Sequence, residues 1–406
     1  MGTVMQRNVL AIVFGTILEW YDFSLFGLMA SVLAKNFFPE VSKAALSWVF
    51  ILFAIGFVAR PLGAIFYGHI GDCYGRKKAI IWMMVSTGIA SLVISLLPTF
   101  KSWGYFALLI LIVCRITQGF SASTEHAGAM VFFYEIKPNF FGPALPIVGV
   151  FLGMTLAAIS YFIALHFMGA KFFGDMGWRV LFLVGAGLSF VAYRLRKNLL
   201  EIIAVKPDKS PFRYITQTGK TNLMLGCLMF QFALVLPYAE FVFIPNYLIH
   251  SQLISQDFIT MMNMSFLVAI SLIILAVSKL FDKKAYMPNY YLYLTSLFFT
   301  MLIALIFLAK GINSKQQVLL CYVLLTVLSV PIISVVPRVL NQLFVRANRL
   351  TGVSLSMNLA AIIFVVLLPL SIGKYLPPMM MIFVVLLISS LACLAAIILL
   401  SKKGII

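Results

Sequence analysis

The chain has 406 residues, of which 63% are apolar, 14% are aromatic and only 10% are charged. Soluble domains are about 45–50% apolar and about 25% charged, so a soluble fold of this composition would expose large apolar areas and aggregate. The cysteines are scattered and form no CxxC or Cys/His cluster, which excludes a disulfide framework and a zinc site. We therefore expect an all-α membrane protein with no metal ion and no cofactor.

The formal net charge is +18, from 30 lysines and arginines against 12 acidic residues. Such a charge would make nucleic acid a candidate partner of a soluble protein. No basic stripe lies on a polar helix with aromatic side chains beside it, so we expect no nucleic-acid binding. In a membrane protein, positive residues gather on cytoplasmic loops, and this placement accounts for most of the charge.

Apolar runs long enough to cross a bilayer follow one another along the chain. A helix needs roughly 20 apolar residues to cross about 30 Å of hydrocarbon. The runs are continuous and lack the alternation of a transmembrane β-barrel. They predict twelve transmembrane helices near residues 8–34, 44–70, 79–98, 104–130, 142–166, 177–196, 222–249, 258–280, 288–309, 316–341, 350–373 and 379–401.

The longest polar interval divides these runs into two groups of six. It predicts an N-terminal six-helix bundle at 1–196, a cytoplasmic linker at 197–221 and a C-terminal six-helix bundle at 222–406. Most lysines and arginines fall on the side that holds this linker, and Arg196 is counted among the cytoplasmic charges. This bias predicts that both termini are cytoplasmic.

Ionisable residues inside the first six runs point to function. A charged side chain at mid-bilayer costs at least about 2.5–3.5 kcal/mol, so it usually faces a partner or a water-filled cavity. Glu19 and Asp22 lie three residues apart on one helix face and interrupt the first run, which we expect to be a retained helix instead of a cleaved signal. Arg60 lies at similar depth, and Arg115 lies near the middle of the fourth run, before Glu125.

Two interpretations of these charges are open. Single pairs, such as Glu19 with Arg60, would hold helices in register. Two carboxylates and two guanidinium groups at one depth exceed that need, and a cavity with arginine as anion clamp and acids as proton carriers explains the set. The residues of the second half that we expect to face a cavity are Glu240, Asn246, Arg338 and Asn358.

The break between the second and third runs reads GHIGDCYGRKK, from Gly68 to Lys78. Its glycines permit close helix approach and a tight turn, and its aspartate can cap a helix N-terminus or pair across the two halves. A basic cytoplasmic turn alone would explain the charges but not this spacing. The expected gating motif consists of Gly68, Gly71, Asp72, Gly75 and Arg76.

This motif resembles the loop signature of the major facilitator superfamily, with Cys73 in place of the usual basic residue. RITQGFSA (Arg115–Ala122) resembles the superfamily's helix-4 motif, whose arginine is associated with proton coupling. Three other segments resemble the metabolite:proton symporters, which include proline/betaine, shikimate, citrate and α-ketoglutarate carriers. These segments are LEWYDFSLFG (Leu18–Gly27), RPLG (Arg60–Gly63) and RLTGVSLSMNLAA (Arg349–Ala361).

The resemblance implies two six-helix halves that rock about a site near the midplane. It implies proton-coupled uptake of a small organic acid or zwitterion across the bacterial inner membrane, without enzymatic activity. We expect protons, the solute and the lipid bilayer as partners, and a functional monomer. The roles implied are proton coupling for Asp22, Glu19 and Arg115, and substrate binding for Arg60, Arg115, Gln118, Glu125 and Tyr21.

Departures from the family pattern leave alternatives open. STEHAGA (Ser123–Ala129) replaces a GGEWGG-like run, so His126 stands where an aromatic residue is common, either titrating or simply packed. SKLFDKK (Ser278–Lys284), the second-half copy of the loop motif, keeps Asp282 but loses its glycines, which argues against two symmetric gates. An exporting proton/solute antiporter and a non-transporting sensor of the same fold remain alternatives, as does sodium as the coupling ion.

Overall fold

The structure is a computed structural model that describes residues 2–38, 43–199, 210–250, 256–283, 300, 315–373 and 375–404. All regular secondary structure within these ranges is helical, so the all-α prediction is confirmed. Ten of the described helices are long and apolar enough to cross a bilayer. The run expected near 288–309 lies outside the described residues, apart from Thr300.

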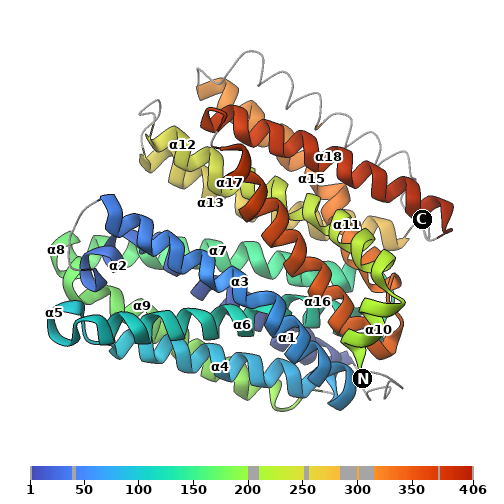
Figure 1. Cartoon of the computed structure of the whole chain (residues 1–406), viewed down its shortest axis with the longest axis horizontal. Helices are drawn as coiled ribbons and strands as arrows, with labels where there is room; N and C mark the ends of the chain where they lie inside the picture. The colour runs from blue at the N-terminus through green and yellow to red at the C-terminus, as the bar shows by residue number, and fades with distance from the viewer. Residues whose placement is uncertain are drawn as a thin grey trace. The chain divides into compact units, whose positions relative to one another are not determined.

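The chain forms two compact units, and each unit includes a short piece from the other half of the sequence. Unit 1 comprises Met1–Phe132, Gly149–Phe212 and Arg346–Ser354. Its helices, in whole or in part, are α1 (Gly2–Leu28), α2 (Ala30–Phe37), α3 (Lys43–Tyr74), α4 (Arg76–Leu96), α5 (Phe100–Trp103), α6 (Tyr105–Ile136), α7 (Phe141–Met168), α8 (Ala170–Phe172), the π-helix η1 (Phe173–Gly177), α9 (Trp178–Arg196), the 3-10 helix η3 (Arg346–Asn348) and the start of α16 (Arg349–Ala360) (Figure 1).

Unit 2 comprises Phe133–Val148, Arg213–Val345 and Leu355–Ile406. It includes the end of α6 and the beginning of α7. Its other helices are α10 (Pro211–Gln217), α11 (Lys220–Tyr238), the π-helix η2 (Ala239–Phe243), α12 (Ile244–His250), α13 (Gln256–Lys283), α15 (Lys315–Gln342), the rest of α16, the π-helix η4 (Ala361–Leu367), α17 (Leu368–Ile372) and α18 (Pro378–Lys402).

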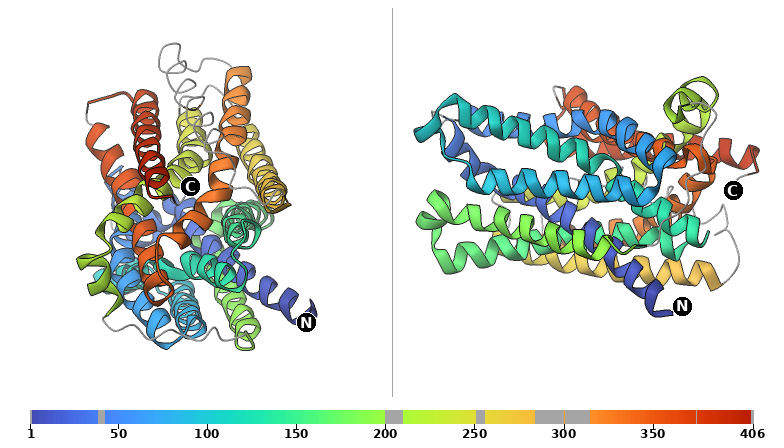
Figure 2. Two further views of the ribbon diagram at one scale, coloured as in Figure 1. Left: turned by 90° about the vertical axis from the view of Figure 1, so that its right-hand side faces the viewer. Right: turned by 90° about the horizontal axis from the view of Figure 1, so that it is seen from below.

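Long helices packed side by side make up each unit. In unit 1, α4 lies along α9, and α1 contacts both, while Figure 2 shows these helices as long rods. In unit 2, α11 lies along α18 and α13 along α15 (Figure 1). Because neighbouring helices cover only part of each helix, large apolar side chains such as Phe167, Trp82 and Val58 stay exposed. Such a surface suits a lipid environment, where exposed apolar groups carry no penalty.

Prolines interrupt several of these helices and bring one candidate residue into an irregular turn. A proline removes one helical hydrogen bond, a loss that membrane helices tolerate because neighbouring groups re-satisfy the backbone. Pro61 and Pro146 lie inside α3 and α7. Pro237 lies at the end of α11, directly before η2, which carries Glu240. Single π-turns in long helices are frequent at functional sites.

The expected cytoplasmic linker at 197–221 is described only in part. α9 ends at Arg196, and α10 occupies Pro211–Gln217 inside the interval. The predicted bundles at 1–196 and 222–406 stay a prediction, because the compact units follow spatial proximity and exchange segments between the two halves of the sequence.

Candidate functional site

Four buried polar residues from α1, α4 and α6 form a hydrogen-bonded chain that we call the Asp22 cluster. The Ser91 hydroxyl donates to Asp22 Oδ2 at 2.5 Å, and Gln118 Nε2 donates to the same hydroxyl at 3.0 Å. Arg115 Nη1 donates to Gln118 Oε1 at 2.9 Å. All four side chains are buried. The carboxylate and the guanidinium are therefore connected through two neutral side chains instead of a direct ion pair.

The surroundings of this cluster keep the carboxylate and the guanidinium apart. The guanidinium carbon of Arg115 lies 3.8 Å from the ring centre of Phe26, so the cation rests on an aromatic face. Asp22 Oδ1 is buried without a hydrogen-bond partner among the described residues. A carboxyl group in this setting can accept a proton on Oδ1 while Oδ2 keeps its bond to Ser91.

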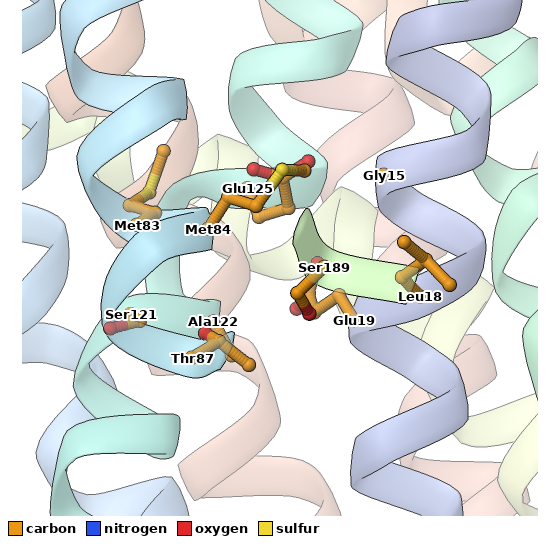
Figure 3. Close-up of a pocket in the computed structure, with 10 residues that line it drawn as sticks. All are labelled: Gly15, Leu18, Glu19, Met83, Met84, Thr87, Ser121, Ala122, Glu125 and Ser189. Atoms are coloured by element: carbon orange, nitrogen blue, oxygen red, sulfur yellow. The ribbon is translucent and has the colours of Figure 1, made fainter. Parts of the chain in front are cut away.

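Glu19 lies one helical turn from Asp22 but belongs to a different environment. It lines a small cavity in unit 1 together with Glu125, and we call this cavity the Glu19 hollow (Figure 3). Its volume is about 20 Å³. The lining residues come from α1, α4, α6 and α9 and are Gly15, Leu18, Glu19, Met83, Met84, Thr87, Ser121, Ala122, Glu125 and Ser189.

Arg60 is not tied to Glu19 by an ion pair within the described part of the chain. The two side chains interact electrostatically. The guanidinium carbon of Arg60 instead lies 4.7 Å from the ring centre of Phe23 and 4.6 Å from that of Phe57. Its Nε and Nη2 are buried and have no hydrogen-bond partner among the described residues. Arg60 therefore offers unused donors, whereas a helix-register pair would have used them.

Arg196 was counted among the cytoplasmic charges, and the structure places its side chain inside unit 1. Arg196 is the last residue of α9, and its side chain is fully buried. It forms an ion pair with Glu125 and donates to the carbonyls of Ala11 at 3.1 Å and Ile12 at 2.9 Å. Its long side chain can reach from the helix end to partners inside the unit, whereas position in the sequence indicates only where its backbone lies.

Two further predicted substrate residues make internal contacts. The Tyr21 hydroxyl donates to the Leu181 carbonyl at 3.1 Å, which ties α1 to α9. Gln118 uses both its amide nitrogen and its amide oxygen inside the Asp22 cluster. His126 is buried on α6 beside Glu125. The roles of Tyr21, Gln118 and His126 stay predictions.

The loop motif places Asp72 against the beginning of α16. Its carboxylate accepts from the backbone nitrogens of Leu350 at 3.1 Å and Thr351 at 2.9 Å, and from the Thr351 hydroxyl at 2.6 Å. It also forms a buried ion pair with Arg76, whose Nη2 donates to the Arg346 carbonyl at 2.9 Å. Gly75 has a φ of 109° and makes the turn between α3 and α4.

Glycines in the loop motif let α3 and α16 approach each other closely. A side-chain carbon on Gly68 would lie 2.8 Å from the Thr351 Cα, and one on Gly71 would collide with the Leu350 side chain. Such distances are shorter than real side-chain contacts, so glycine is required for the observed packing. Asp72 therefore caps the beginning of α16, and Gly68 and Gly71 leave room for Thr351 and Leu350 beside it. A gating role for the motif stays a prediction.

The second-half candidates lie on four different helical elements, η2, α12, α15 and α16. Glu240 is buried in η2 and accepts a hydrogen bond from the Thr326 hydroxyl. Asn358 is buried in α16. Asn246 lies in α12, and its side chain is outside the part of the chain that the structure describes.

Arg338 lies near the end of α15 and away from the middle of that helix. Its guanidinium carbon is 4.2 Å from the ring centre of Phe140. Together with Lys137 and Asp282 it lines a cleft of about 240 Å³ in unit 2. A role for Arg338 in substrate binding stays a prediction.

Sequence reasoning missed Ser91 and Arg196. Ser91 is an ordinary small residue in an apolar run, and nothing local marks it as the bridge between Asp22 and Gln118. Arg196 stands between Arg194 and Lys197 in a basic stretch and resembles these neighbours. The sequence held a signal for Arg196 alone. Glu125 lies inside an apolar run, and a buried carboxylate needs a cation as partner, which a nearby arginine can supply.

Comparison with known proteins adds evidence from outside the chain. The Major Facilitator Superfamily model matches residues 12–361. The ectoine/proline transporter ProP of Corynebacterium glutamicum is 26% identical over 377 residues, which cover 87% of this chain and 74% of that protein. The proline/betaine transporter of Escherichia coli K12 is 30% identical over 275 residues, covering 62% of this chain and only 55% of that protein.

Solved structures show the same fold. The proton:xylose symporter XylE superposes with a TM-score of 0.77 at 14% identity, covering 99% of this chain and 96% of that one. The human organic anion transporter MFSD10 superposes with a TM-score of 0.66 at 15% identity, covering 97% and 99%. The sequence resemblance and the twelve-helix fold class are thereby confirmed. The chain is a multi-pass membrane transporter and belongs to the Major Facilitator Superfamily.

Proposed function

We propose that the protein is a proton-coupled symporter that takes up a small zwitterion or organic acid across the bacterial inner membrane, with both termini in the cytoplasm. The Asp22 cluster is the observation that carries this proposal. It holds a buried carboxylate, one oxygen of which has no hydrogen-bond partner among the described residues, joined through Ser91 and Gln118 to a buried arginine. Charged groups at such depth usually mark proton or substrate pathways.

In this proposal Asp22 binds the proton and Arg115 senses it through the bridging side chains. Protonation of Asp22 removes its charge and weakens the pull on the Ser91 hydroxyl. The amide of Gln118 then reorients, which frees a donor of Arg115 for a substrate carboxylate. Arg60 is the second candidate for that carboxylate, because its Nε and Nη2 donors are unused within the described residues.

The names of the relatives suggest which solutes to test first. Two of them are named as proline, betaine or ectoine transporters. Proline and betaine each carry a carboxylate and a cationic nitrogen, which fits an arginine beside an acid. The Asp72–Arg76 pair acts as a gate in this proposal, because it is buried and fixes the start of α16.

The test uses the full chain in proteoliposomes with an imposed pH gradient and radiolabelled proline or betaine. We expect accumulation in the parent protein and none above empty liposomes for Asp22→Asn and Arg115→Ala. Asp175→Asn is the matched control, since it removes an exposed carboxylate whose partner is Lys35. Full accumulation by both cluster variants would remove the assignment.

The direction of proton movement separates the remaining alternatives. Adding solute outside should raise the external pH if solute and proton enter together. A fall in external pH would indicate an antiporter that exports its solute. No pH change and no solute flux would indicate a sensor with the same fold.

A further inference from the structure

The Glu19 hollow is a second polar site, separate from the Asp22 cluster. Residues of four helices line it, and its volume of about 20 Å³ suits one water molecule, which needs roughly 10–15 Å³. Figure 3 shows Glu19 reaching it from α1 and Glu125 from α6, with Ser189 from α9. A cavity of this size between polar groups is normally wet.

Three buried oxygen atoms around the hollow have no hydrogen-bond partner in the part of the chain that the structure describes. Glu19 Oε2, Glu125 Oε2 and the Ser121 hydroxyl are each buried, and none has a hydrogen-bond partner among the described residues. All three residues are more than nine-tenths buried. Leaving such groups unsatisfied costs about 1–3 kcal/mol each, more when they are charged. A bound water and a shared proton would satisfy them together.

The charges around the hollow favour one proton. Glu125 Oε1 is neutralised by Arg196, and Glu19 interacts electrostatically with Glu125. Arg60 attracts Glu19 without an ion pair and rests on aromatic rings. α4 contributes only Met83, Met84 and Thr87, which are uncharged. Arg196 is committed to Glu125, and Arg60 acts on Glu19 only from a distance, so Glu19 has no ion-pair partner among the described residues and a proton can neutralise it in place of one.

Arg196 fixes the geometry of Glu125. Its guanidinium is anchored by the carbonyls of Ala11 and Ile12 on α1 while it pairs with Glu125 on α6. Gly15 makes this position possible, because a side-chain carbon there would lie 2.7 Å from Arg196 Nε and still closer to its terminal atoms. The pair therefore aims Glu125 Oε2 at the hollow.

We infer that the Glu19 hollow is a second proton-binding site, where Glu19 and Glu125 share one proton through a single water molecule, and that Arg196 is its positioning residue. The inference rests on the proposed proton-coupled transport. The Glu19 O–H bond breaks as its proton passes to the water, and the water gives another of its protons to Glu125 Oε2. One of the two carboxyl groups is ionised before and after this exchange, so no charge is gained or lost in it, and the shared proton leaves the hollow only in a separate release step of the transport cycle.

The first test is infrared spectroscopy of the purified full chain, which needs no solute. We expect a protonated-carboxyl band that is sensitive to exchange into D2O, disappears in Glu19→Gln and shifts in Glu125→Gln. Asp175→Asn should leave the band in place. A Glu19→Gln spectrum identical to that of Asp175→Asn would overturn the inference.

The second test concerns Arg196. A buried carboxylate that loses its ion-pair partner tends to bind a proton, so Arg196→Gln should add a second protonated-carboxyl band from Glu125. The double variant Arg196→Gln/Glu125→Gln should remove that band, and Arg196→Lys should not produce it. Gly15→Ala should reproduce the Arg196→Gln spectrum, because it displaces the guanidinium without removing it. Lower thermal stability without the extra band would show a purely structural role and overturn the assignment.

Two controls separate this inference from the proposed function. Replacing choline chloride with sodium chloride at fixed pH should leave the Glu19 band unchanged, and its loss would assign the hollow to sodium instead. In proteoliposomes, Glu19→Gln should lower the number of protons carried per proline or betaine by one. An inactive parent that still shows the Glu19 band would contradict the proposed function alone. An active parent whose ratio survives Glu19→Gln would contradict this inference alone.

Discussion

Asp72 in unit 1 and Asp282 in unit 2 each cap a helix N-terminus, but different side chains surround the two carboxylates. Asp72 accepts from the backbone nitrogens of Leu350 and Thr351, and Asp282 accepts from those of Phe140 at 2.7 Å and Phe141 at 3.2 Å. Each carboxylate thus caps the beginning of a long helix, α16 in one unit and α7 in the other. The loss of the second-half glycines had argued against a symmetric pair, yet the capping geometry is present twice.

The difference lies in the space beside each cap. Gly71 precedes Asp72 and leaves room for the side chain of Leu350. Phe281 precedes Asp282 and packs edge-on against Phe140, with ring centres 5.8 Å apart. The contact between Gly71 and Leu350 beside the first cap thus corresponds to a contact between the rings of Phe281 and Phe140 beside the second cap. Capping needs only a carboxylate at a helix N-terminus, whereas glycine is needed only where the two helices approach closely.

Asp72→Ala should produce the largest loss of stability. The change leaves Arg76 as a buried cation without its partner, along with the amides and hydroxyl that Asp72 satisfied. We expect a loss of about 3–5 kcal/mol in the free energy of unfolding. The measurement is titration of the detergent-solubilised chain with SDS, followed by circular dichroism. A loss below about 1 kcal/mol would mean that the cap is not formed.

Gly68→Ala should cost about 1–3 kcal/mol, because the added carbon would press on the Thr351 backbone. Gly187→Ala is the matched control, since nothing lies within 4 Å of a side-chain carbon at that position of α9. The control should be neutral or gain up to about 1 kcal/mol, as alanine favours helix over glycine. Equal effects of the two substitutions in the same titration would disprove the close approach at Gly68.

Asp282→Ala should cost about 0.5–2 kcal/mol, the usual value for losing a helix cap. Asp282 forms no ion pair with the described residues, and its two hydrogen bonds to backbone amides are only partly buried. The ratio of this loss to that of Asp72→Ala measures how much the buried Arg76 adds. A loss as large as that of Asp72→Ala would show that Asp282 has a charged partner too.

Ser278→Ala should have the smallest effect, a gain of up to about 0.5 kcal/mol. Ser278 stands four residues before Asp282, as Gly68 stands before Asp72. Its hydroxyl is buried without a hydrogen-bond partner in the described chain, so removing it costs nothing. The same titration should therefore separate Ser278→Ala from Gly68→Ala. A clear loss at Ser278 would show that the second cap is as tightly packed as the first.

The sequence indicated which residues belong to the candidate site, but it did not indicate which of them contact one another. Asp22, Arg115 and Gln118 were recognised as polar residues in apolar runs, and the structure joins them through Ser91. Glu19 was grouped with Asp22 because the two share a helix face. The structure instead turns it toward Glu125 and the hollow. A separation of three residues is slightly less than one helical turn. The side chains of Glu19 and Asp22 therefore point in different directions and lie in separate environments.

The fold class followed from the sequence. Long apolar runs are stable in a lipid bilayer, and there the helix satisfies all backbone hydrogen bonds within one segment. The position of each residue along its helix also followed, since each residue advances a helix by a fixed rise. What needed the tertiary structure was the direction of each side chain around its helix. That direction placed Arg196 inside unit 1 and set Phe281 against Phe140. These outcomes depend on which helices become neighbours, and a long side chain at a helix end can reach either solvent or core.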